Sequence, residues 1–419
     1  MQSNTRIKAS EQVPWYRVAI VSSMVSFSIP TFVTGLELYE GLSLNDLFLA
    51  IVVGAILLTL VGGLIGTTGA ATGMNSYQLS HTIFGKKGAA ILNIAFACSL
   101  VGWFGINLDL FSASINRVAS ATLGVEFSPI LIEAIAGIGM TLTSLFGFAA
   151  INRLATGLVP IMLLVTVAIA VQSGNQLSVD SWLNMEKPAH MSFSDGVSVI
   201  VGVIIIGAII LPDITRFSRQ ARGGVYTAFW SYGVVQTLVL IIAAFSAAAF
   251  ATFDILDVLL ALGIGASVLV VVIAGSWVLN SLNVYSAQLA ISESFPVASP
   301  KVITVVMGVL GMFAAFANIL DHFVTFLSVL TAVFVPVGGI IACDYWLLDK
   351  TKYDSDDYRD DANLPALIAW LAGALIAITT QFFALPSLTQ VSALDAMLLT
   401  AVVYWLLARN QNSAPVADE

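Results

Sequence analysis

Long apolar stretches follow one another along almost the whole chain, and only short polar connections separate them. A helix needs about 20 mainly apolar residues to cross the hydrocarbon core of a bilayer. The pattern therefore predicts an all-α membrane protein with twelve transmembrane helices. The predicted segments are residues 16–40, 45–70, 88–116, 128–149, 152–173, 193–212, 224–251, 258–290, 301–319, 323–348, 364–384 and 389–408.

Two of these segments contain helix-breaking residues at corresponding positions. The first contains SIPTF (28–32), where Pro30 removes a backbone donor, and the sixth contains Gly202, Gly207 and Pro212. A broken helix survives in lipid only where its freed backbone faces protein or a water-filled cavity. Matching breaks in two halves are typical of transporters with inverted repeats and a midplane site. The alternative is that glycine and proline are simply common in membrane helices.

Composition supports the membrane interpretation and excludes several functional classes. The chain has 58% hydrophobic and only 10% charged residues, whereas soluble domains carry about 25% charged residues. Its net charge of −9 does not indicate a nucleic-acid partner. The sequence shows no phosphate-binding loop, nucleophile constellation or metal-ligand spacing. We therefore expect no enzyme, no cofactor and no metal site.

Lysine and arginine set the expected orientation. If the N-terminus is cytoplasmic and each segment crosses once, only Arg117 and Lys187 of the 16 Lys and Arg residues face outside. Cytoplasmic loops carry an excess of these residues in membrane proteins. Both termini are thus predicted to be cytoplasmic, in an inner or plasma membrane.

The third segment contains polar residues where polar groups are costly. Trp103 and Asn107 are four residues apart and share one helix face, so an indole and an amide could bind the face and edge of a flat ring. The alternative is a packing tryptophan beside an interhelical hydrogen bond. Asp109 points to a different face, nearer the outer end, and we interpret it as a rim carboxylate near Arg117.

The eighth segment places Ser276, Asn280 and Asn283 on one helix face, at offsets of 0, 4 and 7 residues. Two amides and a hydroxyl suit a neutral, polar, planar solute, although polar contacts between helices are the alternative. Asp213 ends the sixth segment beside a basic loop, and Glu133 lies near the outer start of the fourth. We interpret Asp213 as part of a cytoplasmic helix-end ion pair, the alternative being that the loop merely carries the positive charge of the inner side, and Glu133 as an interfacial residue.

Four motifs resemble the nucleobase–cation symporter-1 family, in its cytosine permease and purine–cytosine permease branch. They are PVGGIIACDYW (336–346), PDITRF (212–217), GWFG (102–105) and GLSLNDLFLA (41–50), and the resemblance covers roughly residues 15–410. It implies a LeuT-like fold of two five-helix inverted repeats plus two further helices. It also implies that helices one and six are unwound at the substrate site, the second of them at roughly 203–207.

The resemblance further implies which residues bind substrate. Trp103 would stack on a nucleobase, and Asn107 matches the polar position of the family four residues later. Asn280 would contact the substrate, with Asn283 beside it. The substrate-binding residues are then Ser28, Trp103, Asn107, Ile204, Ile206, Gly207, Gly275, Asn280 and Asn283.

Two departures from the family pattern bear on ion coupling and selectivity. Sodium-coupled members carry two hydroxyl residues where this chain has Val278 and Leu279, and a hard cation prefers oxygen ligands. Cytosine permeases carry an asparagine at the position of Gly275. We therefore expect proton coupling, with Asp109, Asp213 and Glu133 as candidate carboxylates, and a relaxed choice among rings.

The sequence thus predicts a symporter that imports a neutral nucleobase by alternating access, with cytosine favoured and purines as further candidates. The lining named above carries no charge, which suits a neutral solute. A sodium-coupled carrier for allantoin, a hydantoin or a thiamine-precursor pyrimidine remains an alternative, as does a channel or non-transporting receptor. We expect a monomer whose partners are substrate, a coupling cation and membrane lipids.

The predicted organisation divides the chain into five parts. They are a cytoplasmic tail (1–15), a first repeat (16–173), a second repeat (193–348), two additional helices (364–408) and a second cytoplasmic tail (409–419).

Overall fold

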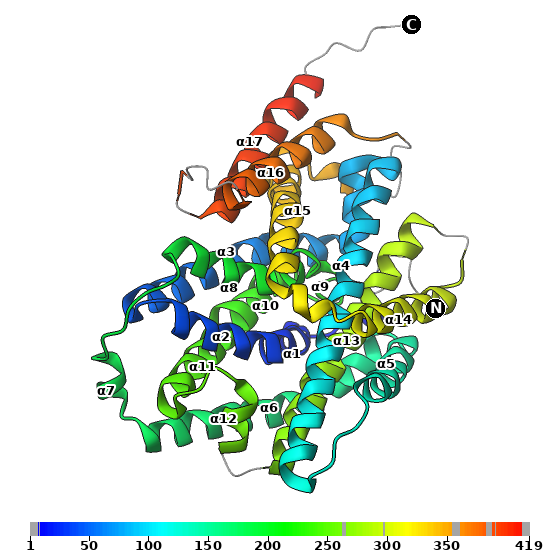
Figure 1. Ribbon diagram of the computed structural model, residues 1–419. Helices are drawn as coiled ribbons and strands as arrows, with labels where there is room; N and C mark the ends of the chain where they lie inside the picture. Colours follow the sequence, from blue (N-terminus) through cyan, green and yellow to red (C-terminus); the bar gives the residue numbers. More distant parts are fainter. Residues whose placement is uncertain are drawn as a thin grey trace, which may run out of the picture.

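The computed structural model describes residues 7, 9–261, 265–295, 298–353, 361–382, 388–389 and 391–412. Residues 1–6, 8 and 413–419 of the two predicted tails lie outside this set. The described residues form helices joined by short connections, which confirms the all-α fold class (Figure 1).

The helices of the first half of the chain include the two on either side of the first break. They are η1 (Ala9–Glu11), α1 (Trp15–Ser26), α2 (Ile29–Gly41), α3 (Leu44–Thr72), α4 (Ser76–Leu123), α5 (Pro129–Leu145), α6 (Phe148–Gln176) and α7 (Val179–Leu183). The helices of the second half are α8 (Phe193–Ile209), α9 (Pro212–Thr215), α10 (Gly223–Ala228), η2 (Phe229–Gln236), α11 (Thr237–Phe250), α12 (Ile255–Ala261), α13 (Gly265–Ser294), α14 (Pro300–Phe316), η3 (Ile319–His322), α15 (Phe323–Cys343), η4 (Asp344–Leu348), η5 (Thr351–Tyr353), α16 (Leu364–Phe382) and α17 (Ser392–Asn412).

Many of these helices are long and apolar enough to cross a membrane. In the described part of the chain seven helices pass this test by length and composition, and the pair α1–α2, bent by 53°, makes up to eight. Three shorter apolar helices, α5, α14 and α16, add to them. The predicted count of twelve spans stays a prediction.

The outer helices carry their large apolar side chains on the surface. Ile135 of α5 is 64% exposed, Phe313 of α14 is 62% exposed and Leu371 of α16 is 62% exposed. Soluble proteins rarely expose contiguous apolar patches of this kind. These faces are therefore suited to contact lipid tails.

The broken helices lie inside the bundle. α4 packs along α13, α3 packs along α8, and α2 packs along α11. Figure 1 shows α16 and α17 grouped beside α15, away from α1 and α2. This arrangement leaves α1–α2, α4, α8–α9 and α13 to enclose the centre of the protein.

The start of α4 is fixed by a capping box. Asn75 Oδ1 accepts from the Gln78 N–H at 2.7 Å, and Gln78 Oε1 accepts from the Asn75 N–H at 3.0 Å. At Gly85 the backbone has φ 71° and ψ 166°, which a side chain would strain and which separates a short arm, 76–84, from the rest of α4. The arm brings the Ser76 N–H against α9.

Candidate functional site

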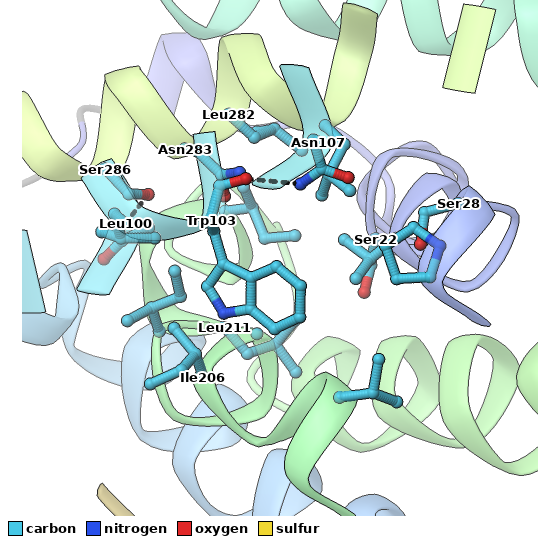
Figure 2. A pocket seen from close by; sticks show the side chains of 18 of the residues that line it. Ser22, Ser28, Leu100, Trp103, Asn107, Ile206, Leu211, Leu282, Asn283 and Ser286 are labelled. Carbon is cyan, nitrogen blue, oxygen red and sulfur yellow. Dashed lines mark hydrogen bonds between the residues drawn. The ribbon is translucent and has the colours of Figure 1, made fainter. Parts of the chain in front are cut away.

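A cavity lies between the two helix breaks and the facing surfaces of α4, η2 and α13. Figure 2 shows the Trp103 indole projecting from α4 into it, with Ile206 and Leu211 beyond the ring and Ser22 and Ser28 to one side. The lining residues are Ser22, Val25, Ser28, Pro30, Leu100, Trp103, Asn107, Val203, Ile206, Gly207, Ile210, Leu211, Asp213, Ile214, Tyr232, Leu279, Leu282, Asn283 and Ser286.

The first helix breaks where the sequence predicts. α1 ends at Ser26, Ser28 has extended backbone angles (φ −74°, ψ 154°), and Pro30 stands in the first turn of α2. Proline is tolerated there because that turn has no helical acceptor for its missing N–H. The break exposes the Ser28 side chain to the cavity.

The sixth helix breaks later than expected. α8 runs without interruption through Gly202 and Gly207 to Ile209, and the chain turns only at Ile210 and Leu211, before Pro212. The prediction of a break over 203–207 is therefore wrong. Glycine permits a bend without requiring one, whereas Pro212 has no N–H to donate to the preceding turn of the helix.

Trp103 and Asn107 share the cavity-facing side of α4. Asn107 Nδ2 donates to the Trp103 carbonyl at 2.8 Å, and the amide is 1% exposed. The Trp103 ring meets Phe326 edge to face at 5.5 Å between centroids. This contact supports one side of the indole and leaves another side toward the cavity.

On α13 the cavity is lined by Asn283 rather than Asn280. Asn280 is fully buried, donates Nδ2 to the Phe104 carbonyl at 3.1 Å, and accepts from Asn283 Nδ2 at 3.2 Å. Neither Asn280 nor Gly275 nor Ile204 belongs to the lining described above. A Cβ added at Gly275 would lie 3.5 Å from the Phe27 carbonyl oxygen, so this glycine faces the first break.

Asp213 gives the lining a carboxylate, so the expectation of an uncharged lining is wrong. Its side chain accepts from the Ser76 N–H at 3.0 Å and from the Ser286 hydroxyl at 2.7 Å. The residue is 1% exposed and lies at the N-terminal end of α4, where a helix dipole favours negative charge. Asp213 therefore lies at the cavity and not at a solvated helix end.

The other two candidate carboxylates lie away from this cavity. Asp109 Oδ2 accepts from the Leu320 N–H at 3.2 Å, and the carboxylate that pairs with Arg117 is Asp257, at 2.7 Å. Glu133 is 5% exposed, so other parts of the protein cover its side chain.

Several lining residues escaped the sequence analysis. Ser22 precedes the first break, Ser286 lies three residues after Asn283, and Tyr232 belongs to the π-helical turn η2. The spacing of Ser286 from Asn283 was a usable signal, because residues three apart share a helix face. Nothing in the local sequence around Tyr232 indicates that it meets the first helix.

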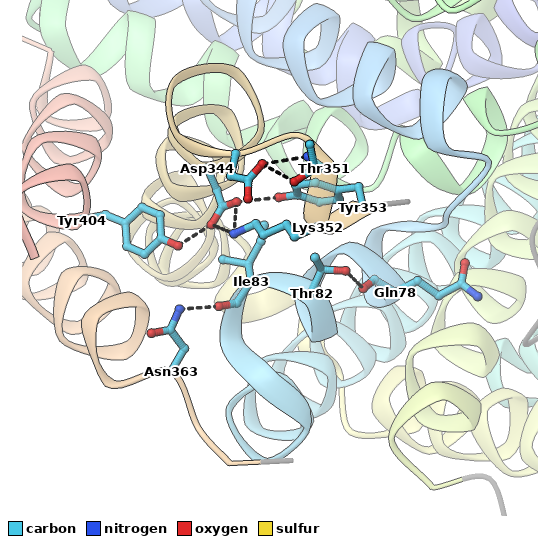
Figure 3. Close-up of polar contacts among 10 residues, drawn as sticks. Gln78, Thr82, Ile83, Asp344, Thr351, Lys352, Tyr353, Asn363 and Tyr404 are labelled. Atoms are coloured by element: carbon cyan, nitrogen blue, oxygen red, sulfur yellow. Dashed lines mark hydrogen bonds and ion pairs between the residues drawn. The ribbon is translucent and has the colours of Figure 1, made fainter. Parts of the chain in front are cut away.

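The motif at 336–346 does not line the cavity and instead contributes to the packing of the helices. Asp344 is fully buried at the end of α15, where Lys352 pairs with both of its oxygens, the Tyr404 hydroxyl donates to one, and the Tyr353 hydroxyl donates to the other at 2.9 Å (Figure 3). The cluster joins the end of α15 to α17. Its role is therefore to hold α15, which packs against α8.

Comparison with known proteins identifies the relatives of this chain. The family of permeases for cytosine/purines, uracil, thiamine and allantoin matches residues 13–407. The chain belongs to this family. The cytosine permease of Escherichia coli (strain K12) is 30% identical over 325 residues, which cover 77% of this chain and 75% of that protein.

Two further relatives extend the comparison. The hydantoin permease of Microbacterium maritypicum is 22% identical over 93% of this chain and 85% of that protein. Among solved structures, Mhp1, a nucleobase-cation-symport-1 family transporter in a closed conformation with bromovinylhydantoin bound, has a TM-score of 0.81 at 19% identity. That match covers 100% of this chain and 97% of the other. These matches confirm the predicted family, and this chain is a membrane permease and not an enzyme.

Proposed function

We propose that this permease is a secondary active transporter that imports a nucleobase by alternating access, with cytosine as its first substrate and purine bases as further substrates. The observation that carries the proposal is the cavity between two broken helices, where the Trp103 indole meets the amides of Asn107 and Asn283. An apolar cavity with a few polar groups is the usual form of a small-molecule site. The 30% identity to a cytosine permease supports the same choice.

The site consists of a stacking surface and polar edges. Trp103 offers a flat apolar face, while Ser28, Asn107 and Asn283 offer hydrogen bonds to ring nitrogens and oxygens. Ile206 and Gly207 form the aliphatic side. Asn280 contributes by holding Asn283, Gly275 by leaving space beside the first break, and Ile204 by packing behind the lining.

The architecture proposed for this function has twelve membrane spans. Two inverted repeats, over 16–173 and 193–348, would move against each other, and 364–408 would add two helices at one side. Both termini would be cytoplasmic, the membrane would be the inner or plasma membrane, and the protein would act as a monomer. The overall match to Mhp1 supports the arrangement of the repeats.

The coupling ion proposed for this chain is the proton. Val278 is fully buried and Leu279 is 8% exposed, and neither side chain can supply oxygen to a hard cation. Asp109, Asp213 and Glu133 are the candidate carboxylates. Asp109 and Glu133 are close enough to influence each other electrostatically, whereas Asp213 lines the cavity.

A carrier for allantoin, a hydantoin or a thiamine-precursor pyrimidine is the second candidate, and the similarity to the hydantoin permease favours it. Purified protein is tested for thermal stabilisation by cytosine, adenine, hypoxanthine, uracil, allantoin and cytidine. A ligand at 100 times its Kd stabilises the folded state by about 2.7 kcal/mol. Counterflow of labelled cytosine in proteoliposomes then separates transport from binding by a receptor. Stabilisation by allantoin or hydantoins, without any effect of cytosine or purines, would contradict the nucleobase assignment.

A further inference from the structure

Asn107 and Asn283, the two amides that line the cavity, each donate one N–H to another group of the protein. The Trp103 carbonyl can only accept, so it fixes the Asn107 amide with Nδ2 toward it and Oδ1 away. The Phe104 carbonyl fixes Asn280 in the same way, and Asn280 Oδ1 then takes Asn283 Nδ2. The orientations of the Asn107 and Asn280 amides therefore follow from backbone acceptors, and the orientation of the Asn283 amide follows from that of Asn280. Each lining amide therefore has its oxygen and one N–H left to meet a solute.

The Asp213 side chain is a further polar group that lines the cavity, and it accepts hydrogen bonds. An ionised carboxylate has about four lone-pair positions and no donor. The Ser76 N–H and the Ser286 hydroxyl occupy only part of this capacity of Asp213. The Ser286 hydroxyl donates its proton to Asp213 in this arrangement, so it cannot donate to a solute at the same time.

The nearby cation does not use up the remaining capacity of Asp213. Arg216 is fully buried, and its Nη2 donates to the Tyr285 hydroxyl at 3.0 Å. Among the described residues, Arg216 Nε and Nη1 have no hydrogen-bond partner, so these atoms do not bond to Asp213 either. The Tyr77 hydroxyl and the Ser76 side chain also lie against this carboxylate. A solute would therefore use the lone-pair positions of Asp213 that face the cavity.

We propose that Asp213, when it is ionised, is a substrate-contacting, specificity-determining residue that selects heterocycles carrying an exocyclic amino group. This inference rests on the proposed nucleobase transport and adds the hydrogen-bond pattern of the substrate. Amino-bearing bases should bind better than the matching oxo bases. Cytosine carries an amino group where uracil carries an oxygen, and adenine differs from hypoxanthine in the same way.

The physical reason is the mismatch that an oxo group creates. A carbonyl oxygen placed at Asp213 would set two acceptors against each other with no proton between them. Buried polar groups left without partners are costly, and sites that hydrogen-bond a substrate reject analogues that lack the bonding group. An amino group in the same position donates to the carboxylate instead.

The test measures binding of the matched base pairs to the full-length protein. Competition against labelled cytosine gives the affinity ratio of cytosine to uracil and of adenine to hypoxanthine, in wild type and in Asp213→Asn. In wild type each ratio should be about tenfold or more, which corresponds to about 1.4 kcal/mol. Asparagine can donate as well as accept, so Asp213→Asn should bring both ratios to within about threefold.

Asp195→Asn is the control, since it makes the same substitution at the exposed N-terminal turn of α8, where Ser192 caps the helix. It should leave both ratios at their wild-type values. The wild-type ratios test the inference even if Asp213→Asn does not fold. Equal binding of the paired bases, or preference for the oxo bases, overturns the role of Asp213 and leaves nucleobase transport standing. If no nucleobase binds at all, the proposed function falls, and this inference falls with it.

Discussion

Replacing Asn280 with alanine tests whether this residue touches the substrate itself or orients its neighbour Asn283. Asn280 is fully buried and links the Phe104 carbonyl of α4 to the Asn283 amide on its own helix. Its removal leaves Asn283 Nδ2 without that acceptor and the Phe104 carbonyl without a side-chain donor. An unsatisfied buried group costs about 1–3 kcal/mol. Since Phe104 also belongs to a helix, we expect the lower end of this range, a loss of about 1 kcal/mol in the free energy of unfolding.

The expected loss of substrate affinity in Asn280→Ala is about tenfold, because Asn283 can then turn its amide away from the substrate. Binding is measured by thermal shift and by competition in Asn280→Ala, Asn283→Ala and the double variant. If Asn280 acts through Asn283, the double variant binds about as weakly as Asn283→Ala alone, with a coupling of about 0.5–3 kcal/mol. Ser276→Ala, one turn earlier on the same face, is the control and should bind normally. Additive losses would refute this reasoning and make Asn280 a direct contact.

Three further outcomes are expected. Trp103→Ala should weaken substrate binding at least about tenfold, and Trp103→Phe should weaken it less, because a smaller ring still stacks; calorimetry measures both. Uptake into proteoliposomes should follow an imposed proton gradient and stay unchanged when potassium replaces sodium; a saturable sodium dependence at fixed pH contradicts the proposal. Asp344→Asn should lower the free energy of unfolding by about 3–5 kcal/mol, because it leaves Lys352 without its buried partner, while Asp349→Asn nearby should lower the thermal midpoint much less.

The sequence was sufficient to predict the first helix break but not the second. Pro30 marks the first break because proline both lacks an N–H and restricts the residue before it. In the sixth helix, Gly202 serves close packing, since a Cβ there would lie 2.9 Å from the Thr331 hydroxyl oxygen. A glycine that permits packing and a glycine that permits a turn look the same in a sequence. In this segment, the helix break that the structure confirms is the one indicated by Pro212.

The candidate site was predictable where one helix supplied the pattern. Periodicity placed Trp103 beside Asn107 on one face, and both line the cavity. It could not tell whether Asn280 or Asn283 faces the cavity, because the rotation of α13 is set by the Phe104 carbonyl of another helix. Asp213 was misplaced for a similar reason. Its neighbours, Ser76 and Ser286, are far away in sequence, so no local pattern could bring them together.

The division of the cavity into two kinds of surface explains where selectivity must arise. Ile206, Leu211, Leu279 and Leu282 give one side an aliphatic surface, which attracts any flat ring without preferring a direction. The family to which the chain belongs is described as carrying cytosine, purines, uracil, thiamine and allantoin, so its shared fold does not by itself choose a substrate. The choice must come from the polar edges, where the Asn107 and Asn283 amides and the Asp213 side chain can meet the edge of the ring. A change of one acceptor, such as that at Asp213, should therefore alter the preferred base without altering the fold.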